Sequence, residues 1–159
     1  MKRAVCPGSF DPITYGHLDI IGRASAQFDE VVVAVGNNRA KEGYFTVEER
    51  MAMIAETTAK FGNVKVDSWK GLLGEYCKAN NIDVIIKGLR AMSDFDYELQ
   101  MAQVNLQGSG VESMFMATSP AHSFLSSSLI KELAHYNGDV SSMVPPVVNA
   151  ALKARKAGK

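Results

Sequence analysis

Short apolar runs alternate with longer amphipathic stretches along the whole chain. Continuous β-branched runs, such as those at 31–35 and 84–86, are typical of strands that are covered on both faces. The pattern predicts strands at 3–6, 31–35, 64–66, 84–86 and 113–116, and helices at 16–26, 46–60, 72–79, 94–107, 127–136 and 147–156. Regular alternation of strand and helix predicts an α/β fold with a five-stranded parallel sheet and helices on both faces.

Local signals support these boundaries. Thr46 and Glu49 form the sequence pattern of a capping box, and Gly62 is placed to end the helix that they begin. The chain shows neither an internal repeat nor a linker, so we expect one domain over residues 1–159.

Composition and charge argue against several classes of function. Hydrophobic residues make up 47% of the chain, and 17 Lys and Arg balance 17 Asp and Glu. A nucleic-acid surface usually brings a basic excess, so no nucleic-acid partner is expected, although a local cationic pocket remains compatible with zero net charge. Cys6 and Cys77 fit no metal or disulfide spacing and are expected to pack as small apolar residues. No apolar run is long enough for a membrane span, and we expect a cytoplasmic protein with no membrane contact.

In a parallel α/β sheet, ligands bind beyond the carboxyl ends of the strands, so the residues there are the candidates for chemistry. After the first strand, Gly8 allows close approach of the backbone, and Ser9 offers a hydroxyl. Gly16 and His17 begin the next helix, where free N–H groups favour an anion. The alternative is a Gly/Pro turn with a capping histidine, and the spacing alone does not decide between the two.

Two further segments carry phosphate-binding groups. Lys87-Gly88-Leu89-Arg90 places two cations directly after a buried strand, and Ser126-Ser127-Ser128 precedes a helix. Simple helix capping needs only one serine, and a loop lysine such as Lys41 is usually solvated. Together, however, these segments converge at the strand ends as a nucleotide crevice requires. Neither a P-loop nor a GxGxxG string is present.

These segments resemble a known family. The nucleotidyltransferase superfamily has a (T/H)xGH motif, which Thr14-Tyr15-Gly16-His17 resembles. The string Pro7-Gly8-Ser9-Phe10-Asp11-Pro12 before it is part of the same resemblance. The order of the later segments resembles bacterial phosphopantetheine adenylyltransferases along nearly the whole chain. These segments are Phe45-Thr46, Glu49-Arg50, 87–90, 94–98, 123–128 and 138–140. The resemblance implies Rossmann-like subunits, hexamers, Mg²⁺, and transfer of adenylyl from ATP to 4′-phosphopantetheine, with coenzyme A as a product-like ligand.

The resemblance also assigns roles to residues. His17 is implied as the transition-state stabiliser at the α-phosphate, and Ser9 as a contact to both substrates. Lys41, Leu73 and Lys87 match positions that hold the pantetheine substrate. The ATP-binding positions match Ser9, Phe10, His17, Gly88, Leu89, Arg90, Glu98, His122, Ser123, Phe124, Leu125, Ser126, Ser127 and Ser128. The chain departs from many members at Lys87, where they carry arginine, and from some at His122, where they carry a large aromatic residue.

The chemistry requires little of the protein beyond positioning. A phosphate monoester has its second pKa near ~6, so the acceptor is already largely dianionic at neutral pH and no general base is expected. Mg²⁺ would be bound mainly through the substrate phosphates, without a protein metal site. The open alternatives are a sister enzyme acting on nicotinamide mononucleotide or glycerol phosphate, a synthetase fragment, and a non-catalytic nucleotide-binding module.

Overall fold

The computed structural model describes residues 1–37 and 43–158. Its elements follow in the order β1 (Arg3–Gly8), α1 (Tyr15–Ser25), β2 (Glu30–Gly36), α2 (Val47–Thr58), η1 (Ala59–Phe61), β3 (Val64–Trp69), α3 (Leu73–Ala79), β4 (Val84–Leu89), α4 (Met92–Ser109), β5 (Glu112–Ala117), α5 (Ser127–His135) and α6 (Pro146–Ala157). The strands form one parallel sheet in the order β3-β2-β1-β4-β5. The predicted fold class is confirmed.

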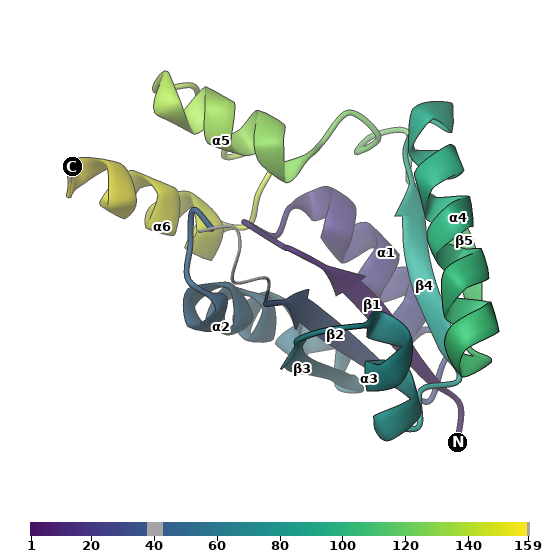
Figure 1. The fold of residues 1–159 in the computed structure, drawn as a ribbon. Helices are drawn as coiled ribbons and strands as arrows, with labels where there is room; N and C mark the ends of the chain where they lie inside the picture. The colour runs from purple at the N-terminus through teal and green to yellow at the C-terminus, as the bar shows by residue number, and fades with distance from the viewer. Residues whose placement is uncertain (38–42, 159) are drawn as a thin grey trace.

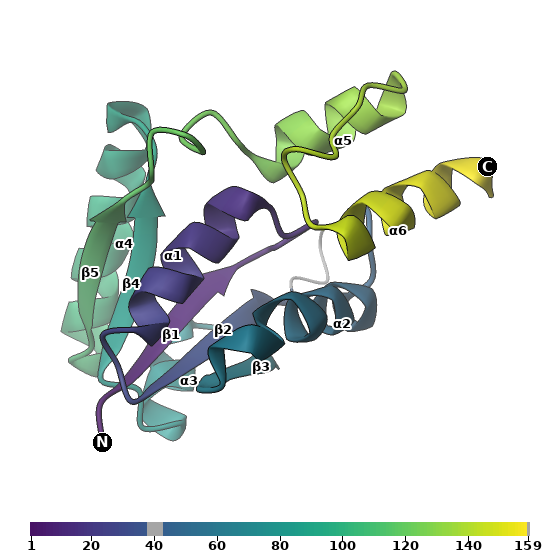
Figure 2. The ribbon, with the colours of Figure 1, turned by 180° about the vertical axis from the view of Figure 1, so that it is seen from behind.

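Both faces of the sheet are covered, and alternate strand residues divide between them. Ala4, Cys6 and Val33 belong to a core with residues of α1, α2, α5 and α6. Val5 and Val32 belong to a second core with Cys77 of α3. Figures 1 and 2 show α3 and α4 on one face and α1 and α2 on the other. The two cysteines are buried, as expected.

The chain crosses from one half of the sheet to the other between β3 and β4. Strands β1 and β2 pair over six residues, from Arg3↔Glu30 to Gly8↔Val35. Strands β1 and β4 pair only at Ala4↔Val84 and Val5↔Ile85. Pro7 has no amide proton to donate, and the β1–β4 pairing ends two residues before it. The sheet therefore opens between β1 and β4 at the point where the strand order reverses.

Two of the boundaries that differ from the sequence prediction bear on the site. We expected Lys87 to Arg90 to be a loop, but β4 continues through Leu89 and pairs with β5 at Lys87↔Phe115, Gly88↔Met116 and Leu89↔Ala117. Likewise β1 continues through Pro7 and Gly8, paired with β2. In both cases a neighbouring strand extends pairing past residues that resemble turn formers in isolation.

Candidate active site

A cavity of about 730 Å³ opens where β1 and β4 separate. Its lining comes from the ends of β1 and β4, the start of α1, the start of α5 and the segment before α2. Open α/β sheets bind ligands at such a switch point in strand order. Among the predicted ATP-binding residues, the cavity brings together Ser9, Phe10, His17, Gly88, Arg90, Glu98, His122, Leu125, Ser126, Ser127 and Ser128.

His17 is the third residue of α1, and the helix start fixes its ring. Thr14 caps the helix by accepting the His17 backbone N–H at Oγ1, and the Thr14 backbone N–H donates to Nδ1 of His17 at 3.0 Å. A ring that accepts at Nδ1 carries its single proton at Nε2 when neutral. Burial, reinforced by Arg90 and Lys87, lowers the pKa of His17 to about 4. At neutral pH the ring is therefore neutral, with Nε2–H as its donor.

Phe10 packs against this histidine. Their ring centroids lie 5.0 Å apart in an edge-on arrangement, and Phe10 is buried. A Cβ added to Gly8 would lie 3.1 Å from the Phe10 ring, so Gly8 clears space for that ring. Gly8 also lines the cavity, so the expected close approach to a ligand stays a prediction, and the structure adds a second use for the missing side chain.

Lys87, Arg90 and Glu98 form the β4 side of the site. The Lys87 ammonium lies 3.4 Å from Glu98 Oε2 on α4. Arg90 donates through Nη1 to the carbonyl of Leu125 at 3.0 Å, and its Nε lies 3.4 Å from Asp94 Oδ2. Arg90 thus joins the end of β4 to the segment that precedes α5.

The three serines have different roles. Ser126 Oγ caps α5 by accepting the Leu129 N–H, and Ser127 Oγ donates to the Pro12 carbonyl at 2.8 Å. All three line the cavity at the helix N-terminus, where backbone N–H groups and the helix dipole favour a phosphate. Two of the hydroxyls are therefore engaged in holding α5 in place beside the turn after β1.

A second cavity of about 250 Å³ lies beside the first, on the α3–α4 side of the sheet. Its lining is mostly apolar and includes Trp69, Leu72, Leu73, Ile85, Met101 and Val104. The two cavities share Pro7, Gly8, Lys87 and Glu98. Lys87 therefore stands at the junction between a polar cavity and an apolar one, and Leu73 lies in the apolar one.

Some predicted site residues lie elsewhere. Leu89, Ser123 and Phe124 do not line the first cavity, and Phe124 is 59% exposed. Lys41 falls outside the described residues.

The structure also adds three charged residues to the cavity that we did not predict: Asp11, Arg50 and Lys131. The sequence signal for Lys131 was its place one turn after the serines, because residues three and four apart share a helix face. The positions of Asp11 and Arg50 depend on contacts between distant segments.

The cavity is cationic although the chain is neutral. Among its described lining residues, Arg50, Lys87, Arg90 and Lys131 outnumber Asp11 and Glu98. Both carboxylates are engaged, Asp11 with two backbone N–H groups and Glu98 with Lys87. An anionic ligand with several phosphates is the chemistry that such a lining favours.

Fold and site together define a nucleotidyltransferase, and comparison with known proteins agrees. The model of the cytidylyltransferase-like family matches residues 5–133. A solved structure from Vibrio parahaemolyticus, described as a nicotinate-nucleotide adenylyltransferase, shares the fold with a TM-score of 0.67 at 17% identity. The match covers 96% of this chain and 91% of that one.

Curated relatives identify the particular family. The phosphopantetheine adenylyltransferase of Streptomyces coelicolor is 61% identical over 98% of both chains. That of Corynebacterium diphtheriae is 58% identical over 96% of both, and that of Thermobifida fusca is 53% identical over 99% of this chain and 96% of its own. The chain belongs to the phosphopantetheine adenylyltransferase family.

Proposed function

We propose that the chain transfers the adenylyl group of ATP to 4′-phosphopantetheine, giving dephospho-coenzyme A and pyrophosphate. The observation that carries this proposal is the junction of two cavities at Gly8, Lys87 and Glu98. The polar, cationic cavity suits a nucleoside triphosphate. The mostly apolar cavity, which contains Leu73, suits the pantetheine arm. An acceptor phosphate at the junction would meet Lys87.

The reaction is a direct displacement. An oxygen of the acceptor phosphate forms a bond to the α-phosphorus. At the same time the bond between the α-phosphorus and the oxygen that bridges to the β-phosphate breaks, and pyrophosphate leaves. Negative charge builds on the equatorial oxygens, and the protein acts by positioning and by charge stabilisation. The neutral His17 ring supplies an Nε2–H donor to an α-phosphate oxygen, in a tautomer that Thr14 holds.

The cations divide between the two substrates. Lys87 offsets repulsion between the acceptor phosphate and the triphosphate, since like charges must approach for the bond to form. Arg90, with the serines at the start of α5, suits the β- and γ-phosphates. Glu98 pairs with Lys87 at 3.4 Å. The acceptor phosphate would compete with this carboxylate for Lys87.

Magnesium is part of the proposal as a companion of the nucleotide. No three His, Cys, Asp or Glu side chains of the described residues gather to hold a metal ion. The hydroxyls of Ser126–Ser128 line the same cavity and would suit the phosphate oxygens that carry such an ion. When bound, Mg²⁺ would neutralise phosphate charge. Titration of Mg²⁺ at fixed ATP should raise the rate to a plateau that tracks the Mg²⁺–ATP complex.

We also propose a homo-oligomer, for which the family resemblance implies six subunits. The apolar segments 51–54 and 99–104 are the two candidates for an interface. The first lies in α2, which packs on its own sheet, because Met53 and Ile54 are buried in the chain's core. Helix α4 keeps apolar side chains outside, with Leu99 38% and Val104 56% exposed. Light scattering at micromolar protein tests this, and a mass near 17.2 kDa that persists as concentration rises would reject the oligomer.

No described helix is long and apolar enough to span a membrane. The cytoplasmic location stays a prediction, which cell fractionation would test.

The decisive experiment measures pyrophosphate release from ATP. The expected result is release with 4′-phosphopantetheine and none without it. Release with nicotinamide mononucleotide in its place would support a sister enzyme. No release with any acceptor, together with measurable ATP binding, would support the non-catalytic nucleotide-binding module.

A further inference from the structure

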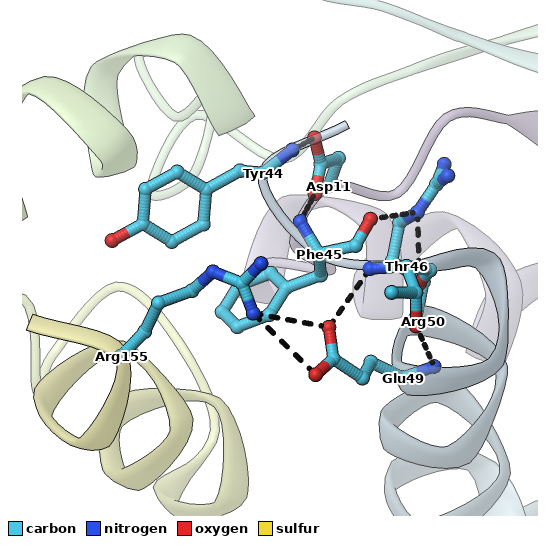
Figure 3. A network of polar contacts seen from close by, with 7 residues as sticks. All are labelled: Asp11, Tyr44, Phe45, Thr46, Glu49, Arg50 and Arg155. Atoms are coloured by element: carbon cyan, nitrogen blue, oxygen red, sulfur yellow. Dashed lines mark hydrogen bonds and ion pairs between the residues drawn. The ribbon is translucent and has the colours of Figure 1, made fainter. Parts of the chain in front are cut away.

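Two segments far apart in the sequence meet at one side of the cavity. Residues 9–11 follow β1, and residues 43–46 precede α2. Asp11 accepts the backbone N–H groups of Tyr44 and Phe45 at 2.7 and 2.8 Å. Arg50 reaches in the opposite direction, from α2 to the Ser9 carbonyl. Figure 3 shows Asp11 and Arg50 on either side of the backbone at Phe45 and Thr46.

Arg50 is a buried cation whose donors serve both segments. Its Nε donates to the carbonyls of Phe45 and Thr46 at 3.1 and 3.3 Å, and its Nη1 donates to the Ser9 carbonyl at 2.8 Å. Its exposed fraction is 7%, although it still lines the cavity. A planar guanidinium can hold acceptors in fixed relative positions, which a lysine ammonium cannot do.

The bond to Ser9 fixes a peptide group at the site. The Ser9 carbonyl and the Phe10 N–H belong to one trans peptide, so the N–H points away from Arg50. It meets no hydrogen-bond acceptor among the residues that the structure describes. Phe10 also has a φ of 47°, which is unfavourable for a residue other than glycine and persists only where neighbours hold it. Its ring packs on His17.

We propose that Arg50 is a positioning residue for adenylyl transfer. By holding the Ser9 carbonyl, it aims the Phe10 N–H at an α-phosphate oxygen and keeps the Phe10 ring against His17. Two donors to the reacting phosphate, one from the backbone and one from an imidazole, are then set by one side chain of α2. The inference rests on the proposed function and extends it to a residue that does not itself touch the substrate.

Arg155 of α6 offers a matched control. Its guanidinium lies over the rings of Tyr44 and Phe45, at 5.4 and 5.3 Å from their centroids, and its Nη1 pairs with Glu49 at 3.3 Å. Figure 3 shows Arg155 on the other side of Phe45 from the Arg50 guanidinium. Arg155 is not among the residues that line the cavity. Loss of Arg155 lowers stability without releasing the Ser9 carbonyl.

The experiment compares Arg50→Met, Arg50→Lys and Arg155→Met by pyrophosphate release, with thermal unfolding measured in parallel. We expect kcat to fall by about 10- to 100-fold in Arg50→Met, because small displacements of donors at a reacting centre have effects of this size. The KM for ATP should change by less than about threefold, since the donors act mainly as charge develops. Arg155→Met should lower the melting temperature and leave kcat within about twofold of the unchanged enzyme.

Arg50→Lys keeps the charge and serves where Arg50→Met does not fold. We expect it to lose about tenfold in kcat, because one ammonium cannot hold both Phe45 and Ser9 in the original geometry. In Arg50→Ala, millimolar guanidinium chloride should restore part of kcat, and an equal concentration of urea should not.

The outcomes separate the two proposals. No pyrophosphate from the unchanged enzyme defeats the proposed function and the role of Arg50 with it. An active unchanged enzyme with an undiminished kcat in a folded Arg50 variant defeats only the role of Arg50. Equal losses of kcat in Arg50→Met and Arg155→Met would show a general effect of stability and would likewise overturn it.

Discussion

The two sides of strand β1 differ in how far their pairing continues. Toward β2, pairing runs over six residues to Gly8, and Val31, Val33 and Val35 of β2 are fully buried. Toward β4, pairing stops at Val5, and the strands separate around the cavity. One strand therefore contributes to a closed core on one side and to a binding site on the other. Substitutions on the closed side should change stability, and those on the open side should change catalysis.

The largest effect is expected at His17. We predict that His17→Ala lowers kcat by about 10²-fold or more, the scale for losing one donor to a developing negative charge. Steady-state pyrophosphate release measures it, and the ATP affinity and melting temperature should change much less. His135→Ala, at the exposed end of α5, is the control and should keep full turnover. Near-normal turnover of His17→Ala would reject the catalytic role.

On the closed side, Val33→Ala should leave chemistry intact and weaken the fold. Loss of two buried methyl groups, with the cavity that remains, costs about 2 kcal/mol in the free energy of unfolding. Chemical denaturation measures this, and kcat of the folded variant should equal that of the unchanged enzyme. A large fall in kcat with unchanged stability would contradict the division between the two sides of β1.

Lys87 tests the junction itself. Lys87→Ala should raise the KM for 4′-phosphopantetheine by about tenfold and the KM for ATP by less, because one charge-assisted contact is lost on the acceptor side. Lys65 is an exposed residue of β3 that pairs with Glu30 of β2, far from the junction in the sheet order, and Lys65→Ala serves as the control. Equal increases for both substrates would mean that the end of β4 had been disturbed as a whole.

The smallest effect is expected in the pH dependence of stability, through the protonation of His17. Its pKa is lowered to about 4, so the folded protein leaves it neutral while the unfolded chain takes up a proton below pH 6.5. Stability should therefore fall as the pH drops from 6.5 toward 4 and should be unaffected by this group above 6.5. ¹⁵N NMR of the ring should show the Nε2–H tautomer at pH 7 with no titration down to pH 5. A midpoint near 6.5 would contradict this environment.

Much of the fold could be predicted because it depends on local patterns. Each predicted strand and helix corresponds to an element of the structure, and the capping box of Thr46 and Glu49 forms as expected. The sequence left open a capping histidine at the start of α1, and His17 does form a capping box with Thr14 while its ring also lines the cavity. The ends of β1 and β4 were placed too early, since pairing with β2 and β5 continues these strands through Gly8 and Leu89.

The site was predicted in part. The candidates at strand ends converge on one cavity because parallel strands end at a common edge, and a pattern along the chain is enough to show this. Asp11 and Arg50 were missed as site residues because their partners lie 33 to 41 positions away. Such contacts depend on how two loops meet, which no periodicity records.

The sequence by itself determined the alternation of elements, their amphipathic faces and the chemical groups at the strand ends, since these follow from side-chain type and spacing. The tertiary structure decided the strand order, the early separation of β1 from β4, the tautomer and lowered pKa of His17, and the position of Arg50 against the Ser9 carbonyl. The physical reason is that these properties depend on burial, on nearby charges and on hydrogen bonds, and the groups involved come from segments that are distant in the chain.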